Sequence, residues 1–289
     1  VSVWYSIALA GGLNGSVGRT ERSRTMKVSN QPVTSREYKL MLNSDRFGDR
    51  NKGAERFLNL IDLLIRKQGG TVEKQDKEER RHTSYLDTPQ FALRQRGFSL
   101  RLREETNGFQ VNLKLRDADR YICAAQDLTA TKPGKIKFEE DILPPFVSKF
   151  SHSNSVSMDT NPHFETIKDV ASLFPVIAGL GIDEDTPVKT ANDFRALEVV
   201  RKLCKFQFEN TETIKASLSF WYLGDDTEWP LVAEFSFDYD AADDEESDLE
   251  KYSPKVVEGT RGFFSAVQNQ AGWLDLTTTT KTAFALEVL

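Results

Sequence analysis

Two consecutive segments of alternating character constrain the fold of this chain more than any other feature. Residues 98–104 and 109–116 each place apolar side chains at every second position and polar side chains between them. A period of two is typical of a β-strand with one buried face. Asn107-Gly108 lies between the two segments, and Asn-Gly is a strong signal for a tight hairpin turn. The sequence therefore predicts two antiparallel strands joined by a short turn.

The polar faces of these two strands are strongly basic. Arg101 and Arg103 share the polar face of the first strand, and Lys114 and Arg116 share that of the second. Like charges on neighbouring strands repel one another, so this pattern favours an anion between them. The alternation recurs in three later segments, which differ in charge: 135–142 with Lys137, Glu139 and Asp141, 201–209 with Arg201 and Lys205, and 231–239 with Glu234 and Asp238.

Two interpretations of these polar faces stay open on the pattern alone. A half-buried antiparallel sheet shows its polar face to water. A barrel closed on itself would instead line a polar lumen with these faces, while helices cover its apolar outside. The separation of basic strands from acidic strands suits a lumen that holds a polyanion together with metal ions.

Further patterns predict helices around such a sheet within one α+β domain. Residues 51–68 carry apolar side chains at helical spacing and are followed by Gly69-Gly70. Asp87 and Thr88 are expected to form a structural turn that caps the next element. The remaining expectations are a strand at 36–42, a charged stretch at 73–81, a loop or insertion at 144–163, helices at 164–178 and 253–270, and a solvated acidic loop at 238–250.

The domain boundaries follow from the same patterns. Residues 1–30 are expected to be an N-terminal leader or extension, and residues 31–289 a single domain with a loop and helix insertion at 144–195. The first 13 residues are apolar but too few to span a bilayer. We therefore expect no membrane partner and a cytoplasmic location, although residues 1–25 could also be part of an export leader.

Composition narrows the classes of function. The chain holds 38 Lys and Arg against 44 Asp and Glu, which gives a formal net charge of −6. An acidic chain is not expected to coat DNA. The two cysteines and three histidines are scattered, which argues against a zinc site. A local basic cavity remains compatible with this charge balance, and the oligomeric state stays open.

One block of the sequence resembles a known family. The run 85–89, Tyr-Leu-Asp-Thr-Pro, is followed by Leu93-Arg94, Gly97, the Leu-Arg-Leu-Arg run at 100–103, and Lys114. This block resembles the core signature of the CYTH superfamily, the triphosphate tunnel metalloenzymes. The resemblance covers roughly residues 35–286 and implies an eight-stranded antiparallel β-barrel, with helices packed outside, whose tunnel binds triphosphate compounds with a divalent metal. Activities in that family include inorganic, thiamine and RNA triphosphatases and a class of adenylate cyclase.

The resemblance also implies roles for individual residues. Carboxylates would hold Mg²⁺ or Mn²⁺, basic side chains would hold the phosphates, and a metal-activated water would attack the terminal phosphorus. The catalytic set would be Glu37, Glu139 and Asp141. The metal set would be Glu37, Glu139, Asp141, Glu234 and Asp238. The phosphate-binding set would be Arg101, Arg103, Lys114, Lys137, Arg201, Lys205 and Lys39.

This sequence departs from the family pattern at two places. The family carries Glu-x-Glu-x-Lys in its first strand, and this chain has Glu37, Lys39 and Met41 at those positions. An acidic residue is also usual in the strand before Glu234, where this chain reads Leu-Ser-Phe-Trp at 218–221. If Lys39 points inward like Glu37, its charge favours anion binding over metal binding there.

The expected function is metal-dependent hydrolysis of inorganic triphosphate, a nucleoside triphosphate or thiamine triphosphate. Two alternatives stay open. The first is a non-catalytic protein of the same fold that binds polyphosphate or a nucleotide, which the substitutions at Lys39 and Met41 favour. The second is an adenylate cyclase-like lyase, which would need residues that recognise a purine.

Overall fold

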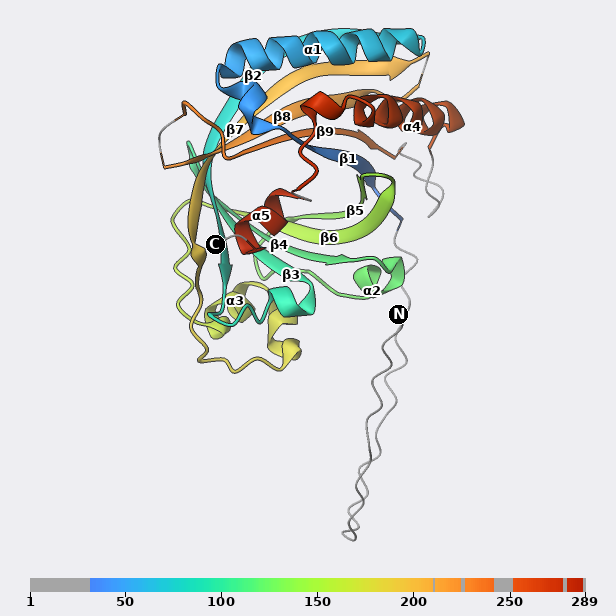
Figure 1. Cartoon of the computed structure of the whole chain (residues 1–289). Coiled ribbons are helices and arrows are strands. Elements are labelled where there is room, and N and C mark those ends of the chain that lie inside the picture. Colours follow the sequence, from blue (N-terminus) through green and yellow to red (C-terminus); the bar gives the residue numbers. More distant parts are fainter. Residues whose placement is uncertain (1–31, 210, 225–226, 242–251, 278–279, 288–289) are drawn as a thin grey trace, which may run out of the picture.

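The chain forms a closed ring of strands with helices packed outside it (Figure 1). The computed structural model describes residues 32–289 except 210, 225–226, 242–251, 278–279 and 288–289. The expected leader at 1–30 and most of the acidic loop expected at 238–250 therefore lie outside the described residues. The described strands are β1 (Ser35–Leu42), β2 (Gly70–Asp87), β3 (Phe98–Glu105), β4 (Gly108–Asp117), β5 (Lys135–Leu143), β6 (Val147–Met158), β7 (Lys189–Phe208), β8 (Ile214–Leu223) and β9 (Val232–Asp240).

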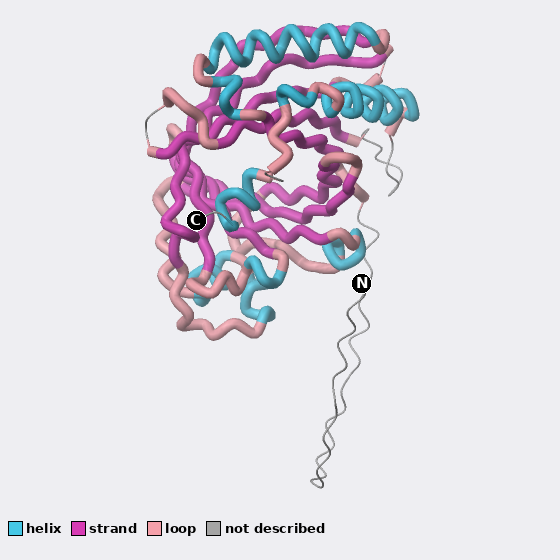
Figure 2. The backbone as a smooth tube through the Cα atoms, viewed as in Figure 1, coloured by secondary structure: helices cyan, strands magenta, loops and turns pink. Residues whose placement is uncertain are grey.

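The strands follow the order β1-β5-β6-β4-β3-β2-β7-β8-β9, and β9 pairs with β1 to close the barrel. All pairs are antiparallel except β1 with β5, in which Glu37 lies opposite Asp141. The closed, mainly antiparallel barrel expected from the sequence is confirmed, with nine described strands in place of eight. Figure 2 shows this ring as a continuous band of strands.

The additional strand pairing comes from two segments that the sequence pattern did not assign to strands. The charged stretch at 73–81 belongs to β2, which pairs with β7 along most of its length. The segment 144–163, expected to be a loop, contains β6, which pairs with β4 and β5. Ser, His and Asn dominate β6 and are poor strand formers on propensity alone. Pairing on both edges of the strand overrides that preference here.

Helices cover the apolar outside of the barrel on two sides. The described helices are α1 (Arg50–Lys67), α2 (Arg120–Ala124), α3 (Ile167–Leu173), α4 (Pro254–Gln268) and α5 (Lys281–Glu287), with short 3₁₀ turns η1 (Ser44–Phe47), η2 (Arg94–Arg96), η3 (Pro175–Leu180) and η4 (Ala271–Trp273). The helices expected at 51–68 and 253–270 are confirmed as α1 and α4, while the one expected at 164–178 is split into α3 and η3. No helix among the described residues is both long and apolar enough to cross a membrane.

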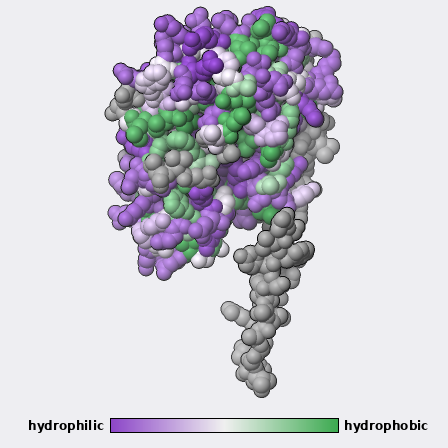
Figure 3. Space-filling view, in the orientation of Figure 1, coloured by the Kyte–Doolittle hydropathy of each residue, from purple (hydrophilic) through white to green (hydrophobic). Residues whose placement is uncertain are grey.

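The two main cores lie between these helices and the outer faces of the strands. Phe57 of α1 and Phe263 of α4 pack against Phe235 of β9 in one core. Leu100 of β3 and Leu113 of β4 belong to the second core, together with residues of α2 and α3. The outer surface of α1 is mostly hydrophilic (Figure 3). The apolar faces of the alternating strands therefore point outward to the helices, and the polar faces point inward.

The C-terminal segment lies at one end of the barrel, where α5 sits against the strands (Figure 1). Ala285 and Leu286 join a third apolar cluster with Met41, Tyr85 and Trp221. The hydroxyl groups of Tyr85 and Thr282 are 3.1 Å apart. This cluster packs α5 against β1, β2 and β8. The turn expected at Asp87 is confirmed nearby, since its carboxylate accepts the backbone N–H groups of Thr88, Leu93 and Arg94.

Candidate functional site

The inside of the barrel holds a cavity of about 330 Å³, here called the tunnel. Every described strand contributes to its lining, and so do Thr280, Lys281 and Thr282 of the C-terminal segment. The lining contains eight basic and four acidic side chains, so it is positive although the whole chain is negative. The basic residues are Lys39, Arg81, Arg101, Arg103, Lys114, Arg116, Lys137 and Lys281, and the acidic ones are Glu37, Glu139, Glu198 and Glu234.

Three arginines of the neighbouring strands β3 and β4 line the tunnel with hydrogen-bonding capacity to spare. The Nε atoms of Arg101, Arg103 and Arg116 are buried and have no hydrogen-bond partner. Burial, with the like charge of Arg101 beside it, lowers the pKa of Arg103 to about 9. The repulsion expected from the basic pattern is therefore present in the folded chain, and no described side chain satisfies these Nε groups.

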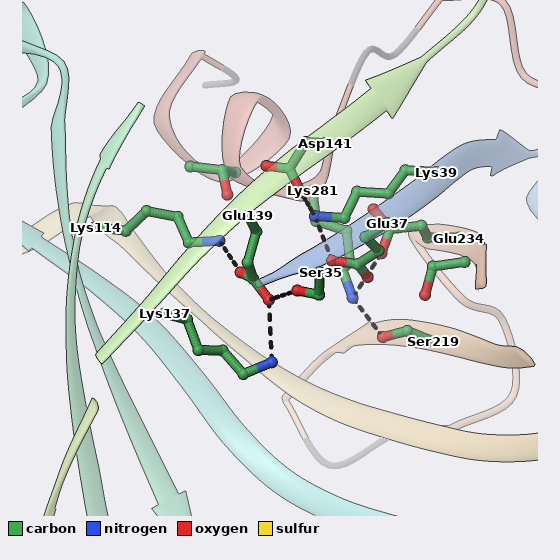
Figure 4. A network of polar contacts seen from close by, with 12 residues as sticks. Ser35, Glu37, Lys39, Lys114, Lys137, Glu139, Asp141, Ser219, Glu234 and Lys281 are labelled. Carbon is green, nitrogen blue, oxygen red and sulfur yellow. Dashed lines mark hydrogen bonds and ion pairs between the residues drawn. The ribbon is translucent and has the colours of Figure 1, made fainter. Parts of the chain in front are cut away.

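A fully buried carboxylate on β5 carries two basic partners. Asp141 has one oxygen 2.7 Å from the ammonium of Lys39 and the other 2.5 Å from the guanidinium of Arg116. Burial alone would raise the pKa of Asp141, but the charges of Lys39 and Arg116 outweigh it and hold this pKa well below its usual range. Lys39 also lies 2.9 Å from Glu37. As Figure 4 shows, Lys39 and Asp141 point toward one another across β1 and β5.

Glu139, two residues earlier on β5, is neutralised in the same way. Its carboxylate lies 3.3 Å from Lys114 and 3.0 Å from Lys137, and it accepts a hydrogen bond from Ser35 (Figure 4). Burial opposes ionisation, but Lys114 and Lys137 outweigh it and lower the pKa of Glu139 to about 2. Glu139 is therefore ionised and fully engaged by its neighbours at neutral pH.

The most connected carboxylate of the tunnel is Glu198 of β7, which is 1% exposed. It pairs with Arg81 at 2.6 Å, Arg103 at 3.1 Å and Lys281 at 3.0 Å. It also accepts hydrogen bonds from Thr83, Ser219 and the indole of Trp221. Burial would raise the pKa of Glu198, but Arg103 and the other cations hold it well below the usual range.

Lys281 links this group to β9. Its ammonium lies 3.0 Å from Glu234 and donates to Ser219 at 2.7 Å, as well as contacting Glu198. Glu234 is thus held by a lysine from the C-terminal segment (Figure 4). Ser219, in the run 218–221 of β8, accepts a hydrogen bond from Lys281.

Asp238 of β9 differs from Glu139, Asp141 and Glu198 in the direction of its pKa shift. Burial and then the nearby charge of Glu37 raise the pKa of Asp238 to about 7. In the sheet Asp238 lies opposite Glu37 on one side and Lys215 on the other. Lys215 donates to Asp240 at 2.7 Å rather than to Asp238. Asp238 is therefore a carboxyl group that changes charge near neutral pH.

The structure gathers most of the residues that the sequence analysis singled out. Those that line the tunnel are Glu37, Lys39, Arg101, Arg103, Lys114, Lys137, Glu139 and Glu234, while Asp141 reaches its wall through Lys39 and Arg116. Lys39 points inward, as the alternation of β1 predicts. Met41, the next position on the same face of β1, is 5% exposed and belongs to the apolar cluster beside α5.

Arg201 and Lys205 do not line the tunnel, which corrects their expected role in phosphate binding. Arg201 instead contacts Asn51 of α1 and Asp76 of β2 at 3.2 and 3.1 Å. A register shift between Lys202 and Cys204 breaks the alternation of β7, so the two basic residues cannot be assigned to one continuous face. The inward residues of β7 are Glu198 and Val200.

Four lining residues were missing from the predicted site: Arg81, Arg116, Glu198 and Lys281. Glu198 interrupts the apolar run 196–200, and a lone carboxylate in a run of that kind is a signal for a buried, paired acid. Arg116 lies two residues after Lys114 and therefore on the same basic face of the strand. The alternation of residues 109–116 was thus a signal for Arg116 as well. Arg81 looked like part of a solvated charged stretch.

The carboxylates of the tunnel do not fit the divalent metal that the resemblance implied. Mg²⁺ and Mn²⁺ need oxygen ligands that are free to coordinate them. Here Glu139, Asp141 and Glu234 are each engaged by lysine or arginine, and Glu37 is 2.9 Å from Lys39. Among the described residues no group of three His, Cys, Asp or Glu side chains is arranged to hold a metal ion.

Comparison with known proteins finds similar chains among solved structures. No protein-family model and no curated protein sequence matches the chain. The chain is similar to a solved structure from Hippeastrum, a candidate adenylyl cyclase with a dominant triphosphatase activity, at 13% identity and a TM-score of 0.45 over 88% of this chain and 96% of that one. It is also similar to a candidate adenylate cyclase from Bacillus halodurans, at 15% identity and a TM-score of 0.39 over 87% and 97% of the two chains.

The strand order decides between an open sheet and a closed barrel. A closed ring of strands surrounds a polar, basic lumen and carries helices outside it. The chain has the predicted closed, mainly antiparallel barrel. Within this barrel, the polar-lumen interpretation of the alternating strands is confirmed and the solvated-sheet interpretation is wrong.

Proposed function

We propose that the tunnel binds the phosphate chain of a triphosphate-containing compound, of which inorganic triphosphate, a nucleoside triphosphate and thiamine triphosphate are the candidates. The observation that carries this proposal is the set of three buried, unpartnered Nε groups on Arg101, Arg103 and Arg116. A buried donor without a partner costs free energy, and so does the repulsion between like charges. A bound polyanion relieves both costs.

The chemistry of the donors selects phosphate over smaller anions. Guanidinium groups match phosphate oxygens in geometry and stay charged, and their hydrogen bonds to anions are stronger than neutral ones. Lys114 and Lys137 supply further positive charge on β4 and β5. A chain of phosphates has enough oxygens to contact several of these groups at once, whereas a single small anion does not.

Hydrolysis of the bound compound is the second candidate function. Asp238 favours it: this residue does not line the tunnel itself but lies opposite Glu37, which does, and a carboxyl group with a pKa of about 7 is suited to accept a proton from an attacking water. In this arrangement the lysines and arginines neutralise the phosphate charge, which is the task that a metal was expected to perform. Binding requires only the basic side chains, so it is the first choice.

A titration calorimetry experiment with a parallel phosphate-release assay tests both functions. Tripolyphosphate, ATP and thiamine triphosphate would each be added to the protein with Mg²⁺ or Mn²⁺ present, beside an Arg101→Ala/Arg103→Ala control. We expect binding that the control loses, and the tightest ligand names the compound. Phosphate release that the control also loses would establish hydrolysis. Binding of none of the three compounds would contradict the proposal.

A further inference from the structure

One lysine of the tunnel occupies the place between two carboxylates of different strands. The Nζ atom of Lys39 is 2.9 Å from Glu37 on its own strand and 2.7 Å from Asp141 on β5. Its side chain is only 13% exposed, and β1 and β5 run parallel here, so that Glu37 lies directly opposite Asp141. The ammonium of Lys39 therefore links the carboxylates of Glu37 and Asp141 where β1 meets β5, and Arg116 contacts Asp141 from β4.

The ammonium of Lys39 retains capacity for a ligand. An ammonium has three N–H donors, and two carboxylates account for two of them. Lys281 offers a contrast, because its three contacts, to Glu198, Glu234 and Ser219, use all of its donors. Both lysines line the tunnel, but only Lys39 can add a phosphate oxygen without giving up a contact.

We propose that the tunnel binds its phosphate chain without a divalent metal, because the ammonium of Lys39 bridges the carboxylates Glu37 and Asp141 to the bound anion. This inference rests on the proposed function. The charges of Asp141 and Glu37 outweigh burial and raise the pKa of Lys39, so the bridge is permanently charged at neutral pH. A divalent ion at this place would have to displace a lysine held by two ion pairs.

Calorimetry with tripolyphosphate in EDTA, compared with the same titration in Mg²⁺, tests the inference on the wild-type protein. We expect binding in EDTA at least as tight as binding in Mg²⁺, since Mg²⁺ also occupies phosphate oxygens. Binding seen only with Mg²⁺ would overturn the inference and leave the proposed function intact. Binding under neither condition would instead overturn the proposed function.

Two substitutions at the bridge sharpen the test. Lys39→Glu brings a third carboxylate beside Glu37 and Asp141, so we expect it to weaken tripolyphosphate binding in EDTA by about tenfold or more and to recover part of the loss in Mn²⁺. Lys39→Arg keeps the charge and is expected to retain more of the binding in EDTA than Lys39→Glu does. Unchanged binding by Lys39→Glu in EDTA would contradict a role for Lys39.

A readout with the metal alone separates this role from a purely structural one. Titration of Mn²⁺ into protein without phosphate is expected to show no binding by the wild type and measurable binding by Lys39→Glu. Mn²⁺ binding by the wild type would overturn the inference. Far-UV circular dichroism checks that the variant is folded, and if it is not, the EDTA comparison on the wild type still decides the matter.

Discussion

Lys281 of the C-terminal segment lies 3.0 Å from Glu198 of β7, and this ion pair joins the end of the chain to the wall of the tunnel. Glu198 simultaneously pairs with Arg81 of β2 and Arg103 of β3. One buried carboxylate thus holds cations from three separate parts of the sequence. These ion pairs join β2, β3, β7 and the C-terminal segment inside the tunnel.

Removal of the Glu198 charge is expected to destabilise the protein strongly. Glu198→Gln leaves Arg81, Arg103 and Lys281 buried without their common partner, and breaking a buried ion pair in this way costs about 3–5 kcal/mol. Urea denaturation measures the free energy of unfolding. Tripolyphosphate is expected to raise the melting temperature of this variant more than that of the wild type, because the anion replaces the lost charge.

The matched control for this variant is an exposed ion pair. Glu104 lies 2.8 Å from Arg195, and both side chains are about half exposed. Glu104→Gln is expected to change the unfolding free energy by about 1 kcal/mol or less. Equal effects of the two substitutions would show that Glu198 does not organise the tunnel.

Arg101 is expected to contribute to binding but not to stability. Arg101→Met keeps the apolar stem and removes a charge that lowers the pKa of Arg103, so the melting temperature should stay constant or rise. Loss of charge-assisted hydrogen bonds should weaken tripolyphosphate binding by about tenfold to a hundredfold. Arg201→Met, on the outside of the barrel, should leave the affinity unchanged. A large loss of stability in Arg101→Met would refute this division of roles.

Asp238 is expected to make stability fall as the pH rises from acidic to neutral. Its folded-state pKa of about 7 lies above the ordinary value of 3.8, so folding favours the protonated group. This contribution is complete below pH 3.8 and is lost as the pH rises through 7. Asp238→Asn should therefore gain stability relative to the wild type between pH 5 and 8, as urea denaturation at several pH values would show. A pH-independent difference between the two proteins would contradict the assignment.

Glu139 is expected to make stability fall as the pH is lowered, the opposite of the effect of Asp238. Lys114 and Lys137 lower its pKa from 4.5 to about 2 despite burial, so its contribution to stability is present above pH 4.5 and lost as the pH falls through 2. Glu139→Gln should be less stable than the wild type at pH 7, and the difference should shrink on acidification. Asp240→Asn, which removes an exposed partner of Lys215, serves as the control. A constant difference down to pH 2 would count against this role.

The sequence predicted those parts of the tunnel that depend on local alternation. Arg101, Arg103 and Lys114 lie where the hairpin pattern put them, because a period of two fixes the face of each side chain once the strand exists. Arg201 was misplaced because a bulge changes the face within β7, and no residue pattern marked that bulge. Its position depends on pairing with β8, which is a long-range property.

The partners of the carboxylates could not be predicted at all from the strands taken singly. The ion pairs of Asp141 come from β1 and β4, and those of Glu198 from β2, β3 and the C-terminal segment. A list of acidic positions resembles a metal site until the cations beside them are known. Lys39 is the one such partner that the sequence did indicate. It stands where the family pattern has a second glutamate, so a positive charge among the carboxylates of the first strand was expected.

The parallel pairing of β1 with β5 has a consequence for how the molecule folds. Ser35 and Glu139 in this pair are 104 residues apart, and contacts of such separation form slowly because a long loop must close first. Before β1 inserts between β5 and β9, Asp141 lacks its bond to Lys39, and the facing edges of β5 and β9 are open. The side of the anion site formed by Lys39 and Asp141 is therefore complete only when β1 closes the barrel, so the full affinity for a polyanion reports that this closure has taken place.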